Sequence, residues 1–535
     1  MSLFQPMEKN QETVVRYCFI FLCAFVSLWL NSSSQPFQKL YGDSTVNDIG
    51  NSIIQTSDGG YLIAGTQFDS GNQIESVFLV RTNENGDTLW TRRMKETVLT
   101  YSGNAIVETY DGGFAVACVR GDGINFAPVL LKVDSSGNLE WNKSYTWGAK
   151  EHIKSIVQAP DSGFLLAGYF YNGDMLVYFI RTNADGDTLW TRCYAKGGFN
   201  AQIYSVQIAA DGGFVAAGSM QEQFNSDVDA FIFKTDSVGN FLWAKGYGES
   251  GYDYAQQVQT TSDGGCVLAA VTYSFGAGLA DYFLVKTDSS GNLLWSKTYG
   301  GASDDRSESV VQTSDDGFLF TGESASNSQG NFDICIVRTN GIGDTIWTKN
   351  FGSIQNNEGY SLTITSDSAF AITGYYYSLS GNTDLLLMKA GAADFVGCTE
   401  TNTVVQVDSP NTRVVNHLLY PIISTPDVGL PLLIVNAGTD IETLCLTDDV
   451  NEQNSEDALL IYPNPVHSTL NIELSKERNS IFQLRVFNIA LSEIKLPVYF
   501  QNNKCTIDCS RLIPGIYIVE ISTDKEIIHR KIIKQ

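Results

Sequence analysis

An all-β fold is predicted by a repeated sequence unit and by two landmarks inside it. The unit is about 52 residues long, which lies in the range of repeats that build four-stranded blades. The first landmark is an Asp-Gly-Gly turn or a close variant, whose seven copies begin at Asp58, Asp111, Asp161, Asp211, Asp263, Asp315 and Asp367. The second is a tryptophan, whose six copies are Trp90, Trp141, Trp190, Trp243, Trp295 and Trp347. Together they predict a seven-bladed β-propeller.

Each repeat reads as four strands. In the second repeat the strands are expected at 105–109, 114–119, 128–133 and 139–145, with turns rich in Asp, Gly and Asn between them. The third strand of a repeat is almost continuously apolar, as in Tyr282, Phe283, Leu284 and Val285, which is typical of a strand that is buried on both faces. Such a blade cannot stand alone, so stacking in a closed ring is expected.

The seventh repeat lacks its fourth strand. It keeps the Asp367 turn and an apolar third strand at 385–389, but no tryptophan follows. Residues 37–42 (FQKLYG) resemble 295–300 (WSKTYG), the fourth strand of another repeat. We therefore expect residues 37–42 to complete the last blade, because open strand edges on both terminal blades would invite aggregation.

The sequence divides into four parts. Residues 1–34 are expected to be a signal peptide, because the apolar run from Tyr17 to Leu30 has 14 residues and is shorter than the roughly 20 that a membrane helix needs. Residues 35–391 form the propeller, 392–457 a small β module or brace with a linker, and 458–535 a C-terminal domain. No membrane span is expected in the mature chain.

The tail carries a family resemblance. After the acidic stretch 448–457 the chain reads Tyr462, Pro463, Asn464, Pro465, and near its end it has Gly515 and Tyr517. This order of motifs resembles the C-terminal sorting domain of the type IX secretion system. The resemblance implies an Ig-like β-sandwich that the export machinery recognises, and a secreted or outer-membrane surface location in a Bacteroidetes bacterium.

The repeats themselves are similar to repeat proteins of secreted Bacteroidetes origin. The turn and tryptophan also resemble pyrroloquinoline-quinone type propeller repeats, but the Asp-to-Gly spacing is one residue shorter and there are seven repeats rather than eight. The quinone is therefore not carried over, and no cofactor is assigned. The formal net charge of −25 argues against a nucleic-acid partner, since phosphate binding uses Lys and Arg.

The sequence assigns no catalytic set. Among the four histidines only His152 lies in the propeller, where we expect a place on a rim, and the tryptophans are expected to pack blades together. Variable loops at 43–48, 248–254 and 303–308 favour a ligand site on one rim. Asp304, Asp305 and Glu308 are weak candidates for calcium ligands, with a solvated loop as the alternative.

Three functions remain open at this point. A binding or adhesion protein for a glycan or another protein is favoured, because the scaffold is present without an evident catalytic set. A structural component of the envelope is the second possibility. The third is a carboxylate-dependent hydrolase or lyase, which requires a cleft where at least two carboxylates with perturbed ionisation converge.

Overall fold

The computed structural model contains two compact units, residues 1–447 and residues 448–535, which are described separately. The described residues are 36–391 without 43–44, 70, 72–73, 96–98, 146–149, 172, 196–198, 223–226, 327, 329 and 378–380; then 400–402, 405–410, 412–417, 420–424, 427–428, 433–435 and 440–445; and finally 459–462, 468–474, 481–488, 493–501, 504–513, 515–523 and 527–534. The expected signal peptide, residues 1–34, lies outside them. In the part of the chain that the structure describes there is no apolar helix long enough to cross a membrane.

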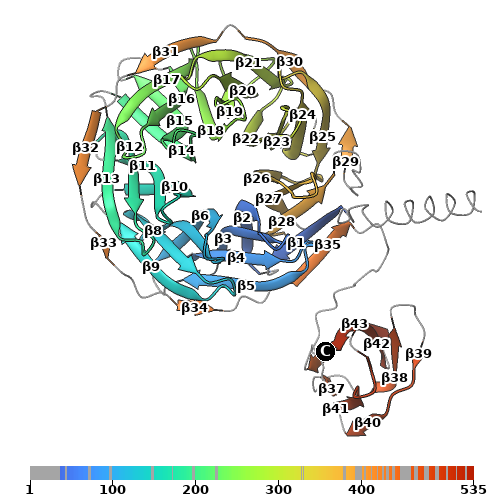
Figure 1. Ribbon diagram of the computed structural model, residues 1–535. Coiled ribbons are helices and arrows are strands. Elements are labelled where there is room, and N and C mark those ends of the chain that lie inside the picture. Colours follow the sequence, from blue (N-terminus) through green and yellow to red (C-terminus); the bar gives the residue numbers. More distant parts are fainter. Residues whose placement is uncertain are drawn as a thin grey trace, which may run out of the picture. The chain divides into compact units, whose positions relative to one another are not determined.

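The first unit is a ring of seven antiparallel blades around a central axis (Figure 1), of which blades two and three are joined into one sheet by a parallel pairing of Lys150 with Phe126. The innermost strands of blades one to seven are β2 (Asn47–Gln55), β6 (Thr100–Glu108), β10 (Lys150–Gln158), β14 (Phe199–Ile208), β18 (Asp253–Thr260), β22 (Asp305–Gln312) and β26 (Asn357–Ile364). The second strands are β3 (Tyr61–Asp69), β7 (Phe114–Gly121), β11 (Phe164–Tyr171), β15 (Phe214–Glu222), β19 (Cys266–Thr272), β23 (Phe318–Ser324) and β27 (Phe370–Tyr377).

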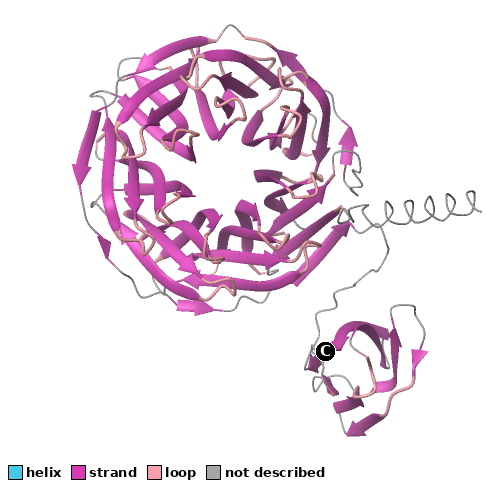
Figure 2. Ribbon diagram, viewed as in Figure 1, coloured by secondary structure: helices cyan, strands magenta, loops and turns pink. Residues whose placement is uncertain are grey.

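The outer half of each blade holds the third and fourth strands. The third strands are β4 (Ile74–Thr82), β8 (Phe126–Val133), β12 (Met175–Thr182), β16 (Val228–Thr235), β20 (Asp281–Thr287), β24 (Asp333–Thr339) and β28 (Thr383–Ala390). The fourth strands of blades one to six are β5 (Thr88–Lys95), β9 (Leu139–Tyr145), β13 (Thr188–Ala195), β17 (Phe241–Gly248), β21 (Leu293–Gly300) and β25 (Thr345–Phe351). Figure 2 shows that the described ring consists of strands and loops.

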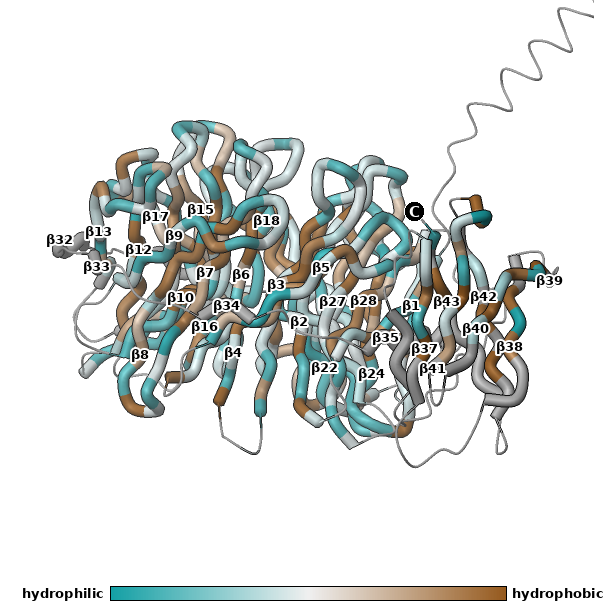
Figure 3. The backbone as a smooth tube through the Cα atoms, turned by 90° about the horizontal axis from the view of Figure 1, so that it is seen from below, coloured by the Kyte–Doolittle hydropathy of each residue, from teal (hydrophilic) through white to brown (hydrophobic). Residues whose placement is uncertain are grey.

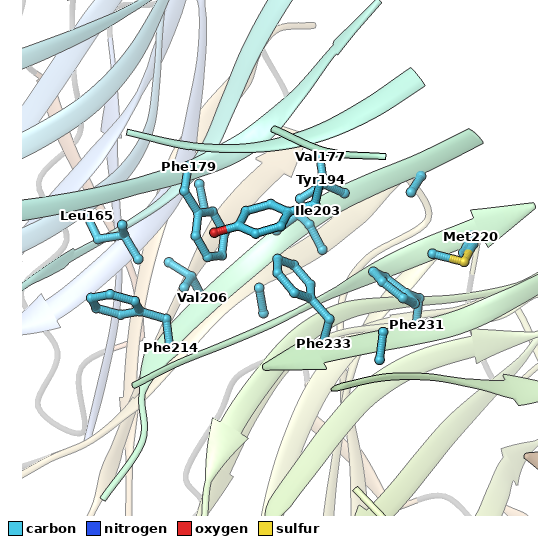
Figure 4. Packing of buried hydrophobic residues seen from close by; sticks show 14 residues of the cluster. Leu165, Val177, Phe179, Tyr194, Ile203, Val206, Phe214, Met220, Phe231 and Phe233 are labelled. Atoms are coloured by element: carbon cyan, nitrogen blue, oxygen red, sulfur yellow. The ribbon is translucent and has the colours of Figure 1, made fainter. Parts of the chain in front are cut away.

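The hydrophobic core lies between the blades. The third strands are almost wholly buried, and every residue of β16, β20 and β24 is buried. Figure 4 shows one such interface, where Phe179 of blade three stacks on Phe233 of blade four at 5.2 Å between ring centroids. In Figure 3 the strands of the ring carry most of its hydrophobic residues, between the two rims. Burial of these apolar faces is the main force that holds neighbouring blades together.

The tryptophans pack blades together, as expected. Trp90 of blade one lies 6.4 Å from Phe114 of blade two and contacts the turn at Gly137. Gly137 has a φ of 77°, and a Cβ there would lie 2.9 Å from the Trp90 ring, so both the backbone conformation and the space require glycine. The same contact recurs between Trp141 and Phe164 at 6.3 Å.

An ion pair with a buried Lys or Arg fixes each Asp turn. The turn aspartate accepts from a Lys or Arg on the third strand of its own blade, as in Asp58 with Arg81 at 2.6 Å and Asp263 with Lys286 at 2.8 Å. The pairs of the other five blades are Asp111–Lys132, Asp161–Arg181, Asp211–Lys234, Asp315–Arg338 and Asp367–Lys389. The aspartate also caps backbone N–H groups of its turn, so it joins the turn to the body of the blade.

The N-terminal strand β1 (Phe37–Gly42) is the fourth strand of blade seven. It pairs antiparallel with β28 over Phe37↔Lys389 to Tyr41↔Leu385, the place that the sequence assigned to it. Its side chains reach blade one: the Tyr41 hydroxyl donates to the Gly86 carbonyl, and Lys39 Nζ pairs with Asp87 at 2.8 Å. Tyr145 makes the equivalent bond to Gly186 at 2.8 Å, so the seam repeats an ordinary blade contact.

The ring is also closed on its inner side. Ser361 Oγ of blade seven accepts from the Ile53 backbone N–H of blade one at 3.3 Å. Gln55 of blade one accepts from the Ser366 N–H of blade seven at 2.7 Å. Both bonds have counterparts between internal blades, namely Ser309 with the Leu362 N–H and Gln312 with the Ser262 N–H. Blades seven and one therefore meet as other neighbouring blades do.

The segment after blade seven adds one short strand to the outer edge of every blade. These fifth strands are β29 (Glu400–Asn402) on β25, β30 (Gln406–Asp408) on β21, β31 (Arg413–His417) on β17, β32 (Tyr420–Ser424) on β13, β33 (Asp427–Val428) on β9, β34 (Leu433–Val435) on β5 and β35 (Asp440–Cys445) on β1. They follow the perimeter of the ring (Figure 1). We call them the belt. These strands form no sheet of their own. The segment therefore matches a brace along the ring, one of the two alternatives from the sequence, and not a separate β module.

The second unit is a small sandwich of two four-stranded antiparallel sheets. One sheet has the order β36 (Leu459–Tyr462), β37 (Thr469–Leu474), β41 (Lys504–Asp508) and β40 (Val498–Gln501). The other has the order β39 (Glu493–Ile494), β38 (Ile481–Asn488), β42 (Gly515–Thr523) and β43 (Ile527–Lys534). Leu470 and Ile507 from the first sheet share one core with Val486 and Val519 from the second.

Shortening Leu40 tests the closing strand. Leu40 is 1% exposed and packs in one cluster with Leu386 and Phe351. We expect Leu40→Ala to lower the free energy of unfolding of the ring by about 3 kcal/mol, the usual cost of a core cavity, as measured by chemical denaturation. Leu89→Ala, at an exposed position of β5, is the control and should change the free energy of unfolding by less than about 0.5 kcal/mol. Equal effects of the two changes would contradict the role given to β1.

Candidate ligand site in the central channel

Every innermost strand carries a β-bulge at the same phase of the repeat. In β2 the register shifts between Gly50 and Ser52, and in β22 it shifts between Ser307 and Ser309. The extra residue of each blade is therefore Asn51, Asn104, Lys154, Tyr204, Gln256, Glu308 or Tyr360. All seven are half-buried. A bulge re-aims a side chain, and here it produces one ring of side chains around the axis, which we call the bulge ring.

Contacts within the bulge ring show that its members face a shared space. Gln256 of blade five donates to both carboxyl oxygens of Glu308 of blade six at 3.0 Å. Glu308 also acts electrostatically on Lys154, which belongs to blade three. Blades three and six are not neighbours, so the two side chains act on each other across the channel.

Three carboxyl groups converge beside the bulge ring. Glu323 of β23 is buried, accepts from Arg306 Nη1 at 2.9 Å and is hydrogen-bonded to Glu358 of β26. Glu358 accepts the hydroxyl groups of Tyr360 at 2.6 Å and Tyr375 at 2.5 Å. Glu308 is the third member, since Glu358 raises its pKa through space. We call Glu308, Glu323 and Glu358 the carboxyl cluster.

The ionisation of this cluster is strongly perturbed. Burial raises the pKa of Glu308 to about 8, helped by the nearby Glu358, and Gln256 opposes the shift. Burial and the neighbouring Glu358 also raise the pKa of Glu323. Burial therefore favours the neutral form of Glu308 at neutral pH, whereas Glu323 is also held by the cationic Arg306. Carboxyl groups with perturbed ionisation thus meet on the inner strands of blades six and seven, which is one part of the condition that the sequence set for carboxylate chemistry.

Aromatic side chains contact one another on the strands and adjoining loops of blades two to five. His152 lies between Phe126 at 4.8 Å and Tyr169 at 5.1 Å, and Tyr169 contacts Tyr204 of the next blade at 6.1 Å. In blade five, Tyr252 lies 5.4 Å from Tyr254 and 6.3 Å from Tyr273. Tyr252 and Tyr273 are 47% and 43% exposed, so aromatic surface is open to solvent there. We call Phe126, His152, Tyr169, Tyr204, Tyr252, Tyr254 and Tyr273 the aromatic arc.

The basic groups of the channel are of two kinds. Burial lowers the pKa of His152 to about 4, with help from Lys154, so its imidazole is neutral at neutral pH. Burial also lowers the pKa of Lys154. Arg306 is different, because its bond to Glu323 raises its pKa further and keeps it cationic. The expected rim residue His152 thus lies on innermost strand β10, among the aromatic arc.

The three candidate calcium ligands point to different partners. Asp305 is buried and accepts from the hydroxyl groups of Ser324 and Ser326, at 2.5 and 2.6 Å, which fixes a loop. Asp304 lies 3.5 Å from Arg306. Of the three, only Glu308 belongs to the bulge ring. Within the described ranges no group of three His, Cys, Asp or Glu side chains is arranged to hold a metal ion.

The tail motif is described only in part. Tyr462 ends β36, where its backbone pairs with Asn471, and Gly515 begins β42 opposite Lys534. Tyr517 is buried, and its hydroxyl donates to the Ile513 carbonyl at 2.8 Å. Pro463, Asn464 and Pro465 lie outside the described residues.

Sequence reasoning did not identify the channel residues as a set. A usable pattern was present, because the bulge position varies while a small residue follows it in six of the seven blades, as in Asn51-Ser52, Glu308-Ser309 and Tyr360-Ser361. Variation at one structural phase of an otherwise regular repeat indicates a position that is free to serve binding.

Comparison with known proteins identifies the tail. Residues 460–535 match the family model described as secretion system C-terminal sorting domain. A search of curated proteins found no match. The sorting domain indicates export by type IX secretion to the cell surface or the extracellular space.

Several solved structures match this chain at low similarity. A protein of unknown function from Dyadobacter fermentans matches with TM-score 0.40 and 10% identity over 66% of this chain and 98% of that chain. Polysaccharide lyase Uly1 matches with TM-score 0.37 and 10% identity over 66% and 98%. Sqt1 from Chaetomium thermophilum matches with TM-score 0.37 and 12% identity over 64% and 82%. These values are too low to transfer an activity, so the channel residues must carry the functional argument.

Glu308→Gln should change how stability depends on pH. The carboxyl group has its ordinary pKa of 4.5 when the chain is unfolded and about 8 when it is folded. Folding therefore binds a proton between these values, and the wild-type protein loses stability as the pH rises from 4.5 through 8. Glutamine does not titrate, so the stability of the variant relative to wild type should rise over the same interval in thermal unfolding. Exposed Glu84→Gln is the control, and an identical pH dependence in both variants would contradict the burial of Glu308.

Proposed function

We propose that this exported protein binds a saccharide in the central channel, at the carboxyl cluster and the aromatic arc. The observation that carries the proposal is the convergence of tyrosines, carboxyl groups and Arg306 from separate blades on one half-buried space. Export by type IX secretion places the channel outside the cell, where glycans are available.

The polar groups of the site suit hydroxyl-rich ligands. Each sugar hydroxyl donates one hydrogen bond and accepts others, so a site with mixed donors and acceptors is favourable. Arg306 and the amide of Gln256 supply donors, and Glu358 supplies acceptors. Glu308 can do either, because it holds its proton at neutral pH.

The aromatic arc supplies the complementary apolar surface. One face of a sugar ring presents C–H groups, which pack against the faces of tyrosine rings. Tyr252, Tyr254 and Tyr273 form such a surface at blade five, and two of them are partly exposed. A few fixed polar groups beside aromatic walls are the usual composition of a small-molecule site.

The charges favour a neutral saccharide over a polyanion. Three glutamates lie in the carboxyl cluster, and the whole chain has a formal charge of −25. Bringing a sulfated or uronate-rich chain close to these groups would be unfavourable unless every nearby glutamate kept its proton. A neutral glycan has no such cost, and we therefore propose it as the ligand class.

Glycan binding should depend on the tyrosine residues of the aromatic arc. We expect Tyr254→Ala to weaken binding of a neutral glycan, identified on a glycan array, by about tenfold in isothermal titration, the usual effect of losing one aromatic contact. Tyr110→Ala is the matched control, because Tyr110 is 68% exposed on an Asp turn at the far end of an innermost strand. The proposal fails if neutral glycans do not bind, or if both variants bind alike.

Removal of the tail should block export and leave the ring intact. Deleting residues 460–535 removes the matched sorting domain but none of the strands of the ring or belt. We expect the deleted protein in the cell fraction and absent from the medium and the washed surface, measured by immunoblot. Its ring should unfold at the same denaturant concentration as the ring of the full-length protein. Normal export of the deleted protein would contradict the assignment of the tail.

A further inference from the structure

We propose that a calcium ion binds between blades five and six, where the side chains of Asp281 and Asp305 meet. This site is separate from the saccharide site proposed above and does not depend on it. Asp281 begins β20, the third strand of blade five, and Asp305 begins β22, the innermost strand of blade six (Figure 1). Both side chains are buried, with 1% and 0% of their surface exposed. We call this place the acid seam.

The two carboxyl groups of the acid seam meet over Gly300, the last residue of β21. A Cβ on Gly300 would collide with Asp281 Oδ1 and lie 2.9 Å from Asp305 Oδ2, so only glycine leaves room for both oxygens. The two oxygens are therefore within about 5 Å of each other. Two ligands of one Ca²⁺ can be that far apart, because each Ca–O distance is about 2.4 Å. The pair can hold one ion between its oxygens.

One oxygen of the acid seam has no hydrogen-bond partner in the described part of the chain. Asp281 Oδ2 accepts from the Ala277 N–H at 2.8 Å, but Asp281 Oδ1 accepts no hydrogen bond. The nearby Gly301 N–H donates instead to Asp305 Oδ2 at 2.8 Å. A buried carboxylate oxygen without a partner is unfavourable, and a bound ion or water molecule is the usual remedy. Asp281 Oδ1, which is turned towards Asp305, therefore indicates a ligand.

The seam between blades four and five shows which kind of ligand fits. Asp229 and Asp253 meet there over Gly248, and a Cβ on that glycine would lie 2.5 Å from an oxygen of each. The belt supplies a cation at this seam. Arg413 of β31 lies opposite Gly248, and its guanidinium group is 3.4 Å from Asp229 Oδ1. The chain thus offsets the charge of this pair with a positive group of its own.

At the acid seam the belt supplies a further acid instead. The belt residue opposite Gly300 is Gln406 of β30, which takes the place that Arg413 has at the neighbouring seam. Gln406 donates to Asp408 at 3.1 Å, and Asp408 acts electrostatically on Asp281. Negative charge therefore gathers where the neighbouring seam has a guanidinium group, and a bound cation would offset it.

Calcium suits the acid seam better than magnesium. Ca²⁺ accepts irregular sets of oxygen ligands, whereas Mg²⁺ demands a nearly octahedral set. The site has two protein carboxyl groups and not three, so water must supply most of the remaining ligands. The Ser326 hydroxyl donates to Asp305 Oδ2 at 2.6 Å. A hydroxyl group can rotate, and this rotation would release a lone pair of Oδ2 for the ion.

A proton is the alternative way to relieve the pair. Burial raises the pKa of Asp281 to about 6, and the neighbouring Asp305 and Asp408 add to the shift. Above that pH the carboxyl group is ionised, so its unpartnered oxygen can bind a cation. Calcium and the proton therefore compete for the same oxygen, and binding must be measured at neutral pH or above.

The test uses the full-length protein after a chelator has removed metal ions, and the probe is CaCl₂ alone. Isothermal titration should show a dissociation constant of about 0.5 mM, which is typical of extracellular calcium sites. Calcium at about 5 mM should raise the midpoint of thermal unfolding of the ring by about 2 °C. Asp281→Asn should bind one Ca²⁺ fewer than wild type and lose this shift. Asp304→Asn is the matched control and should bind calcium as wild type does, because Asp304 lies 3.5 Å from Arg306 instead.

A second variant tests the site without removing a ligand. Gln406 is exposed, so Gln406→Arg should fold, and it copies Arg413 of the neighbouring seam. We expect Gln406→Arg to lose the same calcium ion. In the absence of calcium its midpoint of thermal unfolding should be higher than that of wild type, because the guanidinium group offsets the charge of the pair. Misfolding cannot produce loss of calcium binding together with a gain of stability.

Three outcomes would overturn the proposal. One is that the wild-type protein neither binds calcium at millimolar concentrations nor gains stability from it. Another is equal calcium binding by Asp281→Asn and wild type, which would place the ion elsewhere. If Asp281→Asn is then also more stable than wild type, a proton relieves the pair. The last is unchanged calcium binding by Gln406→Arg.

Discussion

The pairing of β1 with β28 is the constraint on which the rest of the first unit depends. Six blades carry four consecutive strands, and the seventh is completed from the other end of the chain. A ring that is closed by backbone hydrogen bonds holds both terminal blades in place, and each loses an open edge. The channel exists only in the closed ring, because Glu308, Lys154 and the aromatic arc come from blades that do not all touch each other.

The sequence predicted the ring because every blade requires the same turn and packing residues. Asp-Gly-Gly turns, tryptophans and apolar third strands recur with one period, since every blade meets the same packing problem. The closing strand was predictable for the same reason, because residues 37–42 match a fourth strand. The basic partner of each turn aspartate could also have been found, because a Lys or Arg recurs at one phase from Arg81 to Lys389.

The channel and the belt were harder to predict for physical reasons. The bulge ring depends on a one-residue shift of register, which no propensity of Asn51 or Glu308 alone predicts, and its side chains meet only through the curvature of the ring. Glu323 comes from a second strand, and only the fold brings it to Glu358. The belt strands dock through backbone hydrogen bonds, which nearly any sequence can make, so they leave little pattern.

The bulge ring also explains how one scaffold can serve different ligands. The residues that hold blades together, such as Trp90, Phe114 and Asp58, lie outside the channel and repeat almost unchanged. The seven bulge residues are of five types, with Asn and Tyr each present twice. Asn51 and Asn104 donate to backbone carbonyl groups of the following blades. Ligand specificity can therefore change through the bulge residues while the repeated packing residues stay the same.

The order of the belt has a consequence for folding. The blades follow the chain once around the axis, and the belt strands return in the opposite sense, from blade six back to blade one and then to blade seven. β29 docks on blade six, the neighbour of the blade that precedes it in sequence, and each later strand starts from a neighbour that is already anchored. The belt strands can therefore dock one after another, and each step closes only a short loop and costs little chain entropy. Its last strand, β35, covers β1, so the seam is sealed only when the circuit is complete.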